Sequence, residues 1–256
     1  MLLQNTKHYI FLSSYRVYAD LERPIKETSP RLLEVSDDAE FLSHAQTEYA
    51  LYKAQEEDIL RDSAYTNWTI LRPSMVYSTY RYQLVGLEAP TFIARAYKKK
   101  TVVLPENAMK LHAALTWSGD VAKMILGLLL NENAFGETYT IASGEPITWA
   151  EVAACYKNLL QLDIVTVSQE EYAKIFELFP AEWYKHLYDR FYDRTIDNSK
   201  ILKATGLSKH DFVNFEKGIY YELTQIKDKE IWQESTISIQ MDRYLENRQK
   251  QICNHV

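Results

Sequence analysis

The stretch Tyr49-Ala50-Leu51-Tyr52-Lys53 is a Tyr-x-x-x-Lys motif inside a segment, Ala45 to Arg61, that the sequence predicts to be helical. Residues four apart lie on the same face of a helix, so the Tyr49 hydroxyl and the Lys53 ammonium can act on one small volume. A free phenol has a pKa near ~10, and a fixed cation beside it favours the ionised form, which is a base. Taken alone, the motif more often belongs to an ordinary helix surface, so the flanking sequence decides its interpretation.

Two strand-like runs flank this helix. Upstream, Tyr9-Ile10-Phe11-Leu12 is an apolar run that ends in the hydroxyls of Ser13 and Ser14. Downstream, Trp68-Thr69-Ile70-Leu71 ends at Arg72 and Pro73, and a proline cannot continue a strand ladder. Residues 19–43 between the first strand and the helix are polar and contain two prolines, so we expect a loop there.

Three ordered motifs resemble those of the extended short-chain dehydrogenases/reductases, also called the NAD-dependent epimerase/dehydratase family. The first, residues 13–18 (Ser-Ser-Tyr-Arg-Val-Tyr), is similar to the family's serine-bearing strand end. The second is the Tyr49 and Lys53 pair, and the third, residues 71–77 (Leu-Arg-Pro-Ser-Met-Val-Tyr), is similar to its "LRPxxVYG" element. Weaker similarity continues to about Tyr221. The resemblance implies an α/β fold: part of a doubly wound, Rossmann-like parallel sheet with a smaller C-terminal α/β substrate lobe.

The same resemblance predicts the domain organisation. Residues 1–150 would form the C-terminal half of a Rossmann-like domain with interleaved segments of the substrate lobe, and residues 151–256 mainly the substrate lobe and C-terminal helices. Family members begin with a Gly-rich turn that holds the dinucleotide pyrophosphate at a helix N-terminus. This chain has seven glycines, the first is Gly86, and none forms such a motif. It therefore resembles a truncated member, whose strand at Tyr9–Leu12 would lack a neighbour on one edge.

The resemblance also implies a chemistry. Tyr49 would take a proton from a sugar hydroxyl, Lys53 would hold the nicotinamide ribose of NAD or NADP, and Ser14 would hydrogen-bond the reacting oxygen. In such a site the cofactor carries the hydride chemistry and the protein supplies orientation and charge. The expected substrate is a small molecule of the nucleotide-sugar type.

The residues expected at the site fall into three groups by role. The catalytic residues would be Ser14, Tyr49 and Lys53, the cofactor-binding residues Ser13, Tyr49, Lys53, Pro73 and Ser74, and the substrate-binding residues Met75 and Arg194. Taken singly, Ser14 is better explained as a strand-end hydroxyl that bonds a backbone group, and Arg72 as an ion-paired strand terminus.

Two departures from the family pattern bear on the reaction. Tyr15 and Arg16 stand where sugar-nucleotide 4,6-dehydratases carry an acidic pair, which argues against dehydration. Met75 stands where many epimerases have an asparagine for the sugar diphosphate, so we expect a substrate that differs from a common nucleotide hexose.

Composition sets the outer bounds. The 256 residues, 46% hydrophobic and 25% charged, are typical of globular proteins. A net charge of −6 without a basic stripe predicts no nucleic-acid partner. Cys155 and Cys253 are too few for a disulfide framework or a metal site and fit a cytoplasmic location. No apolar run approaches the ~20 residues of a membrane span.

Two hypotheses from different classes remain open. In the first, the chain is an epimerase or reductase whose cofactor-binding half is supplied by a complementary N-terminal chain or by a longer protein. In the second, it is a catalytically inactive remnant that acts as a binding or assembly module. The open strand edge also makes a homodimer a candidate assembly.

Overall fold

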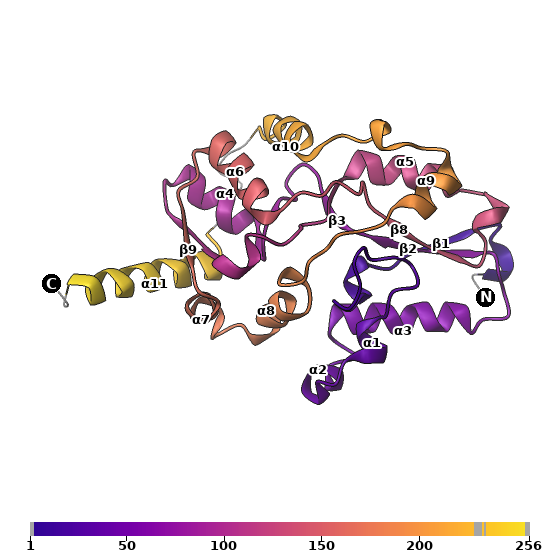
Figure 1. Cartoon of the computed structure of the whole chain (residues 1–256), viewed down its shortest axis with the longest axis horizontal. Helices are drawn as coiled ribbons and strands as arrows, with labels where there is room; N and C mark the ends of the chain where they lie inside the picture. The colour runs from indigo at the N-terminus through magenta and orange to yellow at the C-terminus, as the bar shows by residue number, and fades with distance from the viewer. Residues whose placement is uncertain (1–2, 228–231, 233, 254–256) are drawn as a thin grey trace. The chain divides into compact units, whose positions relative to one another are not determined.

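The structure is a computed structural model that describes residues 3–227, 232 and 234–253. The chain divides into two compact units, each assembled from three segments (Figure 1). Unit 1 comprises Met1–Tyr77, Ala114–Pro146 and Asp193–Phe215, and unit 2 comprises Ser78–Ala113, Ile147–Tyr192 and Glu216–Val256. The segments of the two units therefore alternate along the chain.

Unit 1 is built on parallel strands. Its main sheet has the order β1-β2-β8, formed by Tyr9–Leu12, Trp68–Pro73 and Glu137–Ile141, with all neighbours parallel. A second parallel pair joins β3 (Met75–Tyr77) to β7 (Leu115–Trp117). These strands confirm the predicted α/β class with a parallel sheet. The two strand-like runs seen in the sequence become β1 and β2.

Helices cover both faces of the main sheet, as Figure 1 shows. On one face lie α3 (Tyr49–Arg61) and α1 (Leu32–Val35), and on the other α5 (Ser118–Leu128) and α9 (Ser199–Thr205). The central strand β2 is therefore buried on both sides, which explains its nearly continuous apolar sequence. The core on the α5 and α9 face comprises Leu71, Met124, Leu128, Ala134, Tyr139, Ile141 and Ile201.

Strand β1 lies at the edge of the sheet. Within the described residues it pairs with β2 alone. Ile10 packs against the α5 and α9 core, whereas Phe11 lies beneath the ammonium of Lys53 on the α3 face. Leu12 at the end of the strand is 52% exposed. The strand is thus covered on its two faces but has no strand along one edge in the part of the chain that the structure describes.

Some helix boundaries differ from the sequence-based expectation. The motif helix begins at Tyr49, not near Ala45, because the Glu48 carboxylate caps it by accepting hydrogen bonds from two backbone N–H groups. Asp120 lies buried inside the first turn of α5. The expected loop at residues 19–43 contains two short helices, α1 and α2 (Ala39–Ser43).

Unit 2 contains a parallel strand pair, a short hairpin and most of the remaining helices. The pair is β6 (Val102–Pro105) with β9 (Ile164–Val167), and the hairpin is β4 (Gln83–Leu84) with β5 (Leu87–Glu88). Thr148 and Glu151 form a capping box at the start of α6. The helices are α4 (Ala89–Tyr97), α6 (Trp149–Leu160), α7 (Gln169–Ala173), α8 (Pro180–Lys185), α10 (Phe215–Thr224) and α11 (Thr236–Cys253).

The aromatic-rich stretch 183–192 forms part of the core of unit 2. It folds as the end of α8 and a π-helical turn, His186–Arg190. The fully buried His186 ring packs against four aromatic side chains, those of Tyr172, Phe176, Trp183 and Phe191. Burial lowers the pKa of His186 to about 3, so its imidazole is neutral at physiological pH.

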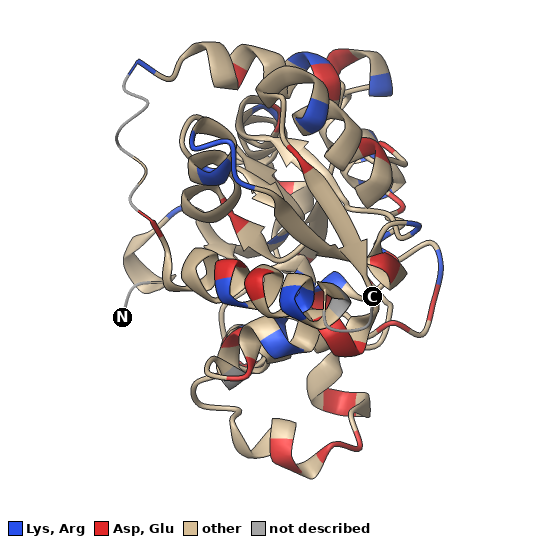
Figure 2. Ribbon diagram, turned by 90° about the vertical axis from the view of Figure 1, so that its left-hand side faces the viewer, with Lys and Arg blue, Asp and Glu red and all other residues tan. Residues whose placement is uncertain are grey.

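Basic and acidic residues are mixed along the helices of the protein. Figure 2 shows Lys and Arg interspersed with Asp and Glu along the helices. No helix among the described residues combines the length and the apolar character needed to cross a membrane. In the same part of the chain, no three His, Cys, Asp or Glu side chains gather in a way that could hold a metal ion.

Candidate active site

A single buried carboxylate joins the three sequence motifs. Glu57 on α3 is completely buried, and its Oε1 accepts hydrogen bonds from Ser13 Oγ at 2.6 Å and Arg72 Nε at 2.8 Å. Its Oε2 accepts from Arg72 Nη2 at 2.6 Å. Arg31 and Arg61 donate to the same oxygen at 3.2 and 3.1 Å. The strand end at Ser13, the motif helix and the end of β2 are therefore fixed to one another through one side chain.

The protonation states of this network follow from its geometry. Burial raises the pKa of Glu57, but the hydrogen bonds and charge of Arg72, together with the Ser13 bond, outweigh burial and leave the pKa below its usual range. Burial likewise lowers the pKa of Arg72, and the Glu57 bonds more than compensate, so the net shift is upward. Both groups stay charged, and neither is available as a general acid or base.

Arg72 has the structural role that the sequence offered for it. It is an ion-paired strand terminus, buried, with its guanidinium 4.6 Å from the ring centroid of Tyr18. Its Nη1 also donates to the backbone oxygen of Glu27. Such a buried pair is costly to break because either partner left alone is an uncompensated charge.

The serines at the end of β1 are both buried and both bonded. Ser13 donates its hydroxyl hydrogen to Glu57. The Ser14 Oγ accepts a hydrogen bond from the backbone N–H of Arg16 at 3.2 Å and caps a short 3-10 turn, Tyr15–Val17. Ser14 is thus a strand-end hydroxyl that bonds a backbone group, as one of the two interpretations of the sequence expected.

Tyr49 and Lys53 have different neighbours in the structure. Tyr49 is the first residue of α3, is 44% exposed, and has the Arg16 guanidinium 5.3 Å from its ring centroid. The Lys53 ammonium forms an ion pair with Glu56 at 2.8 Å and lies 4.8 Å from the Phe11 ring centroid. A partly exposed pair three residues apart on a helix is weak, so Lys53 can leave Glu56 at little cost.

The residues after Arg72 lie where three strands end. Ser74 Oγ lies 2.7 Å from Thr116 Oγ1. Thr116 Oγ1 also accepts a hydrogen bond from the backbone N–H of Ser143 at 3.0 Å. Pro73 is the last residue of β2 and pairs in register with Ile141. Carboxyl ends of parallel strands are the usual location of ligand sites in open α/β sheets.

The two expected substrate residues are buried. Met75 begins β3 with a buried side chain, and its backbone N–H donates to the oxygen of Ala114. Arg194 donates from Nη1 to the Tyr18 oxygen at 3.1 Å, and its guanidinium lies 5.2 Å from the Tyr15 ring centroid. Arg194 also lines a cavity of about 10 Å³, room for no more than a single water molecule.

The sequence did not predict the contacts of Glu57 and Arg16, which connect the expected site residues to one another. A signal for Glu57 was present: the buried face of the motif helix is Ala50, Leu51, Ala54 and Glu57, so a carboxylate interrupts an apolar stripe. A buried acid almost always has a charged partner, and that partner cannot be read from spacing. Arg16 gave no comparable signal.

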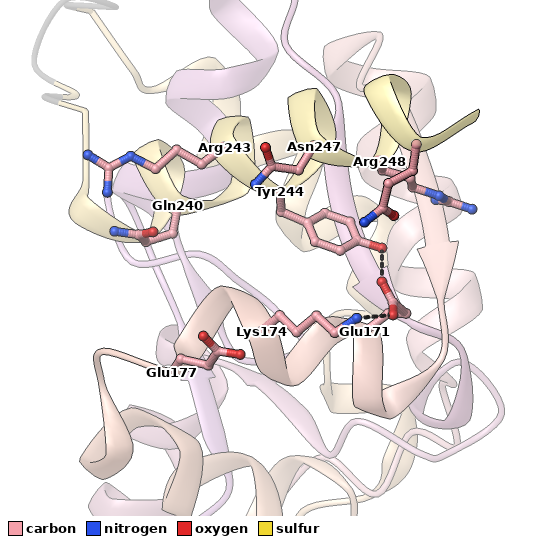
Figure 3. Close-up of a pocket in the computed structure, with 9 residues that line it drawn as sticks. Glu171, Lys174, Glu177, Gln240, Arg243, Tyr244, Asn247 and Arg248 are labelled. Atoms are coloured by element: carbon pink, nitrogen blue, oxygen red, sulfur yellow. Dashed lines mark hydrogen bonds and ion pairs between the residues drawn. The ribbon is translucent and has the colours of Figure 1, made fainter. Parts of the chain in front are cut away.

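A groove in unit 2 is lined by residues far in sequence from all of the predicted site residues. It has a volume of about 320 Å³ and lies between α11 and the segment Gln169–Phe176 (Figure 3). The Tyr244 hydroxyl donates to Glu171 at 3.0 Å, and Lys174 pairs with the same carboxylate. The Arg243 and Arg248 side chains point toward opposite ends of the groove in Figure 3, so they do not converge on one ligand.

Comparison with known proteins adds a family and several solved relatives. The model of the "NAD dependent epimerase/dehydratase family" matches residues 1–142, more than half of the chain. A search of curated proteins found no match. Among solved structures, RMD from Pseudomonas aeruginosa complexed with NADPH is 17% identical, with a TM-score of 0.58 over 85% of this chain and 65% of its own.

Two further solved structures show the same fold. The dTDP-glucose 4,6-dehydratase from Bacillus anthracis in complex with NAD is 20% identical, with a TM-score of 0.57 over 90% of this chain and 67% of its own. The UDP-N-acetylglucosamine 4-epimerase from Methanobrevibacter ruminantium, in complex with UDP-N-acetylmuramic acid, is 17% identical, with a TM-score of 0.62 over 86% and 63%.

The present chain thus spans about two thirds of the length of these structures, and at such identities they demonstrate a shared Rossmann-type fold. The family itself rests on the match over residues 1–142, which includes all three motifs and the Glu57 network that joins them. The chain belongs to the NAD dependent epimerase/dehydratase family.

Proposed function

We propose that the chain is the substrate-binding part and the Ser-Tyr-Lys part of an NAD(P)-dependent epimerase or reductase that acts on a nucleotide sugar. The observation that supports this most is the Ser13–Glu57–Arg72 network, because it fixes the three motifs of the family in one region of unit 1.

In this proposal each side chain has one task. The Tyr49 oxygen would take the proton of a sugar hydroxyl. NAD or NADP, when bound, would accept the hydride of the adjacent C–H bond, so that the sugar carbon becomes a ketone. Ser14 would donate a hydrogen bond to the reacting oxygen, and Lys53 would leave Glu56 to hold the nicotinamide ribose.

The residues present fit the nicotinamide end of the cofactor. Tyr49 and Lys53 are both partly exposed on one face of α3, so a ligand can reach them. Pro73 and Ser74 follow β2 at the carboxyl end of the sheet. The relatives solved with NADPH and with NAD support the cofactor class, and the epimerase solved with UDP-N-acetylmuramic acid supports a nucleotide-sugar substrate.

The proposal favours epimerisation or reduction over dehydration. Loss of water from a sugar needs a group that protonates the leaving hydroxyl. At the two positions after Ser14, the Tyr15 ring lies beneath Arg194 and the Arg16 guanidinium pairs with Glu48 at 2.9 Å. Neither side chain is an acid suited to that task.

The pyrophosphate end of the cofactor needs a further contribution, because the sequence contains no Gly-rich turn. We propose that a Gly-rich βαβ unit, on a complementary N-terminal chain or in a longer protein, supplies it and pairs along the open edge of β1. A homodimer that pairs at this edge would cover β1 but would not supply the turn. The half-exposed Leu12 marks that edge. The two cysteines, neither of them in a disulfide, agree with a cytoplasmic location.

A second candidate function follows from the same missing turn. Without a pyrophosphate site, the chain could act as a binding or assembly module that no longer turns over a substrate. Strand addition at the β1 edge would then be its activity. Leu12→Lys should weaken such assembly, because a charge on an edge strand opposes pairing.

Ligand titration separates the two candidates. NAD, NADP and a panel of UDP- and dTDP-sugars are added to the chain, both alone and mixed with a Gly-rich N-terminal βαβ unit, while its thermal unfolding is followed. A ligand at ~100 times its Kd stabilises a protein by about 2.7 kcal/mol, which raises the Tm by several degrees. If the chain is an enzyme, both a cofactor and a nucleotide sugar should raise its Tm. Lys53→Met should reduce the rise in Tm that the cofactor causes. Shifts with neither ligand class would leave the assembly module as the explanation.

A further inference from the structure

Arg16 contacts both Ser14 and the beginning of α3, the helix that carries Tyr49. Its backbone N–H donates to Ser14 Oγ at 3.2 Å. Its guanidinium donates to Glu48 at 2.9 Å, and the guanidinium carbon lies 5.3 Å from the centroid of the Tyr49 ring. The Arg16 side chain is only 14% exposed, so these contacts are made in a largely desolvated position.

The partner carboxylate strengthens the constraint on Tyr49. Glu48 is the residue immediately before Tyr49, and its second oxygen caps α3 by accepting from the backbone N–H groups of Ala50 and Leu51. The guanidinium is therefore hydrogen-bonded to the residue that caps the helix and lies over the ring of its first residue.

The Tyr49 ring is about half exposed. It is 44% exposed, and in the described residues no aromatic ring packs on it. The Lys53 ammonium, one helical turn away, is bonded to Glu56. A half-exposed ring in the first turn of a helix samples more than one rotamer unless a neighbour restricts it. The cation over this ring therefore comes from the Ser14 loop.

We infer that Arg16 is a positioning residue that holds the Tyr49 ring in a fixed orientation beside Ser14. This role rests on the proposed function, in which the Tyr49 and Ser14 oxygens must meet the same sugar hydroxyl. A guanidinium suits the task because it stacks flat on a ring and pairs with a carboxylate at the same time, which an ammonium does not. Arg16 then sets the positions of both the Ser14 and the Tyr49 hydroxyl oxygens.

NMR of the ring tests the orientation without any need for turnover. The protein is labelled with ring-¹³C tyrosine, and Tyr49→Phe assigns the Tyr49 signal. Arg16→Met removes the cation and keeps the side-chain length, while Arg23→Gln, an exposed arginine paired with Asp20, is the matched control. We expect contacts between Arg16 and the Tyr49 ring in the wild type, and a shifted Tyr49 signal in Arg16→Met but not in Arg23→Gln.

An unchanged Tyr49 signal in folded Arg16→Met overturns the inference. Should that variant not fold, Glu48→Gln removes the charge of the partner but keeps an oxygen that can cap α3, and the same shift is expected. An unshifted ring signal in Glu48→Gln, together with no Arg16 contact to the ring, likewise overturns it.

Steady-state kinetics tests the consequence of that orientation. We expect NAD(P)-dependent turnover of a nucleotide sugar to lose about tenfold or more in kcat in Arg16→Met, with KM within about twofold, because displacement of a reacting group acts on the chemical step. Arg16→Lys should recover part of the loss. A change in Tm without a change in kcat would mark a structural role and overturn the inference.

The two proposals fail separately. Wild-type turnover with an unchanged kcat in Arg16→Met leaves the proposed function intact and removes the role of Arg16. Wild-type protein that binds neither cofactor nor nucleotide sugar removes the proposed function, and the positioning role falls with it.

Discussion

The carboxylate of Glu57 and the guanidinium of Arg72 form a two-point ion pair, at 2.8 and 2.6 Å, between α3 and the end of β2. Both side chains are excluded from solvent. Their geometry is the two-point geometry in which arginine and carboxylate interact most strongly. The pair is the mechanical link between the helix that carries Tyr49 and Lys53 and the strand that leads to Pro73 and Ser74.

We predict that Glu57→Gln lowers the free energy of unfolding by about 3–5 kcal/mol, because it leaves the buried Arg72 charge uncompensated. Urea denaturation measures the change. Glu56→Gln is the matched control on the same helix, and loss of its partly exposed pair should cost no more than about 0.5 kcal/mol. Equal effects of the two substitutions would contradict the importance assigned to the Glu57 network.

The same network predicts an asymmetry between its partners. Arg72→Met removes one cation but leaves Glu57 with Arg31 and Arg61, which are already within hydrogen-bond distance. The remaining carboxylate is therefore still compensated, and we expect a smaller loss of unfolding free energy than in Glu57→Gln. The reverse order, measured in the same urea series, would show that Arg31 and Arg61 do not share the charge.

Stability should depend on pH through His186. Burial holds its pKa at about 3 in the folded protein, against 6.5 for an ordinary histidine. As the pH falls below 6.5 the unfolded chain takes up the proton first, so the stability supplied by the neutral ring is full above pH 6.5 and decreases toward pH 3. The slope contributed by one such group is at most about 1.4 kcal/mol per pH unit.

We therefore predict a shallower pH dependence of unfolding between pH 6.5 and 4 in His186→Gln than in the wild type. Chemical denaturation at several pH values measures it. His210→Gln, at an exposed position in unit 1, should keep the wild-type slope. Identical slopes in all three proteins would mean that the buried ring does not titrate as described.

The same ring explains why residue 86 is a glycine. A Cβ added at Gly86 would lie 1.9 Å from His186 Nε2, and the aromatic cluster leaves the ring no free direction. We expect Gly86→Ala to destabilise unit 2 by about 1–3 kcal/mol. In a His186→Ala background that cost should disappear, because the two positions share one space. An unchanged cost in the double variant argues against steric overlap as its cause.

Tyr49→Phe should separate chemistry from stability. The ring is 44% exposed, and no hydrogen bond from its hydroxyl is among those of the described residues, so loss of the oxygen should change unfolding by less than about 0.5 kcal/mol. If the proposed function holds, turnover should fall at least about 100-fold, because the base is gone. Coupled cofactor absorbance and thermal melts measure the two effects, and retained turnover would refute Tyr49 as the base.

The sequence by itself determined the local structure and the family. Apolar runs ending at Leu12 and Leu71 predicted β1 and β2, and three motifs in fixed order indicated the family. These signals could be read because strand periodicity, helix capping and motif order depend on residues close together in the chain.

Tertiary structure decided the partners of the polar side chains. Glu57 bonds Ser13 and Arg72, which lie 44 and 15 residues away in sequence, while Lys53 turns to Glu56 and Arg16 covers the Tyr49 ring. Spacing placed Tyr49 and Lys53 on one helix face but could not say which charge would meet which ring. That choice depends on the packing of α3 against the ends of β1 and β2, because burial forces each desolvated charge to take whichever opposite charge the fold brings within reach.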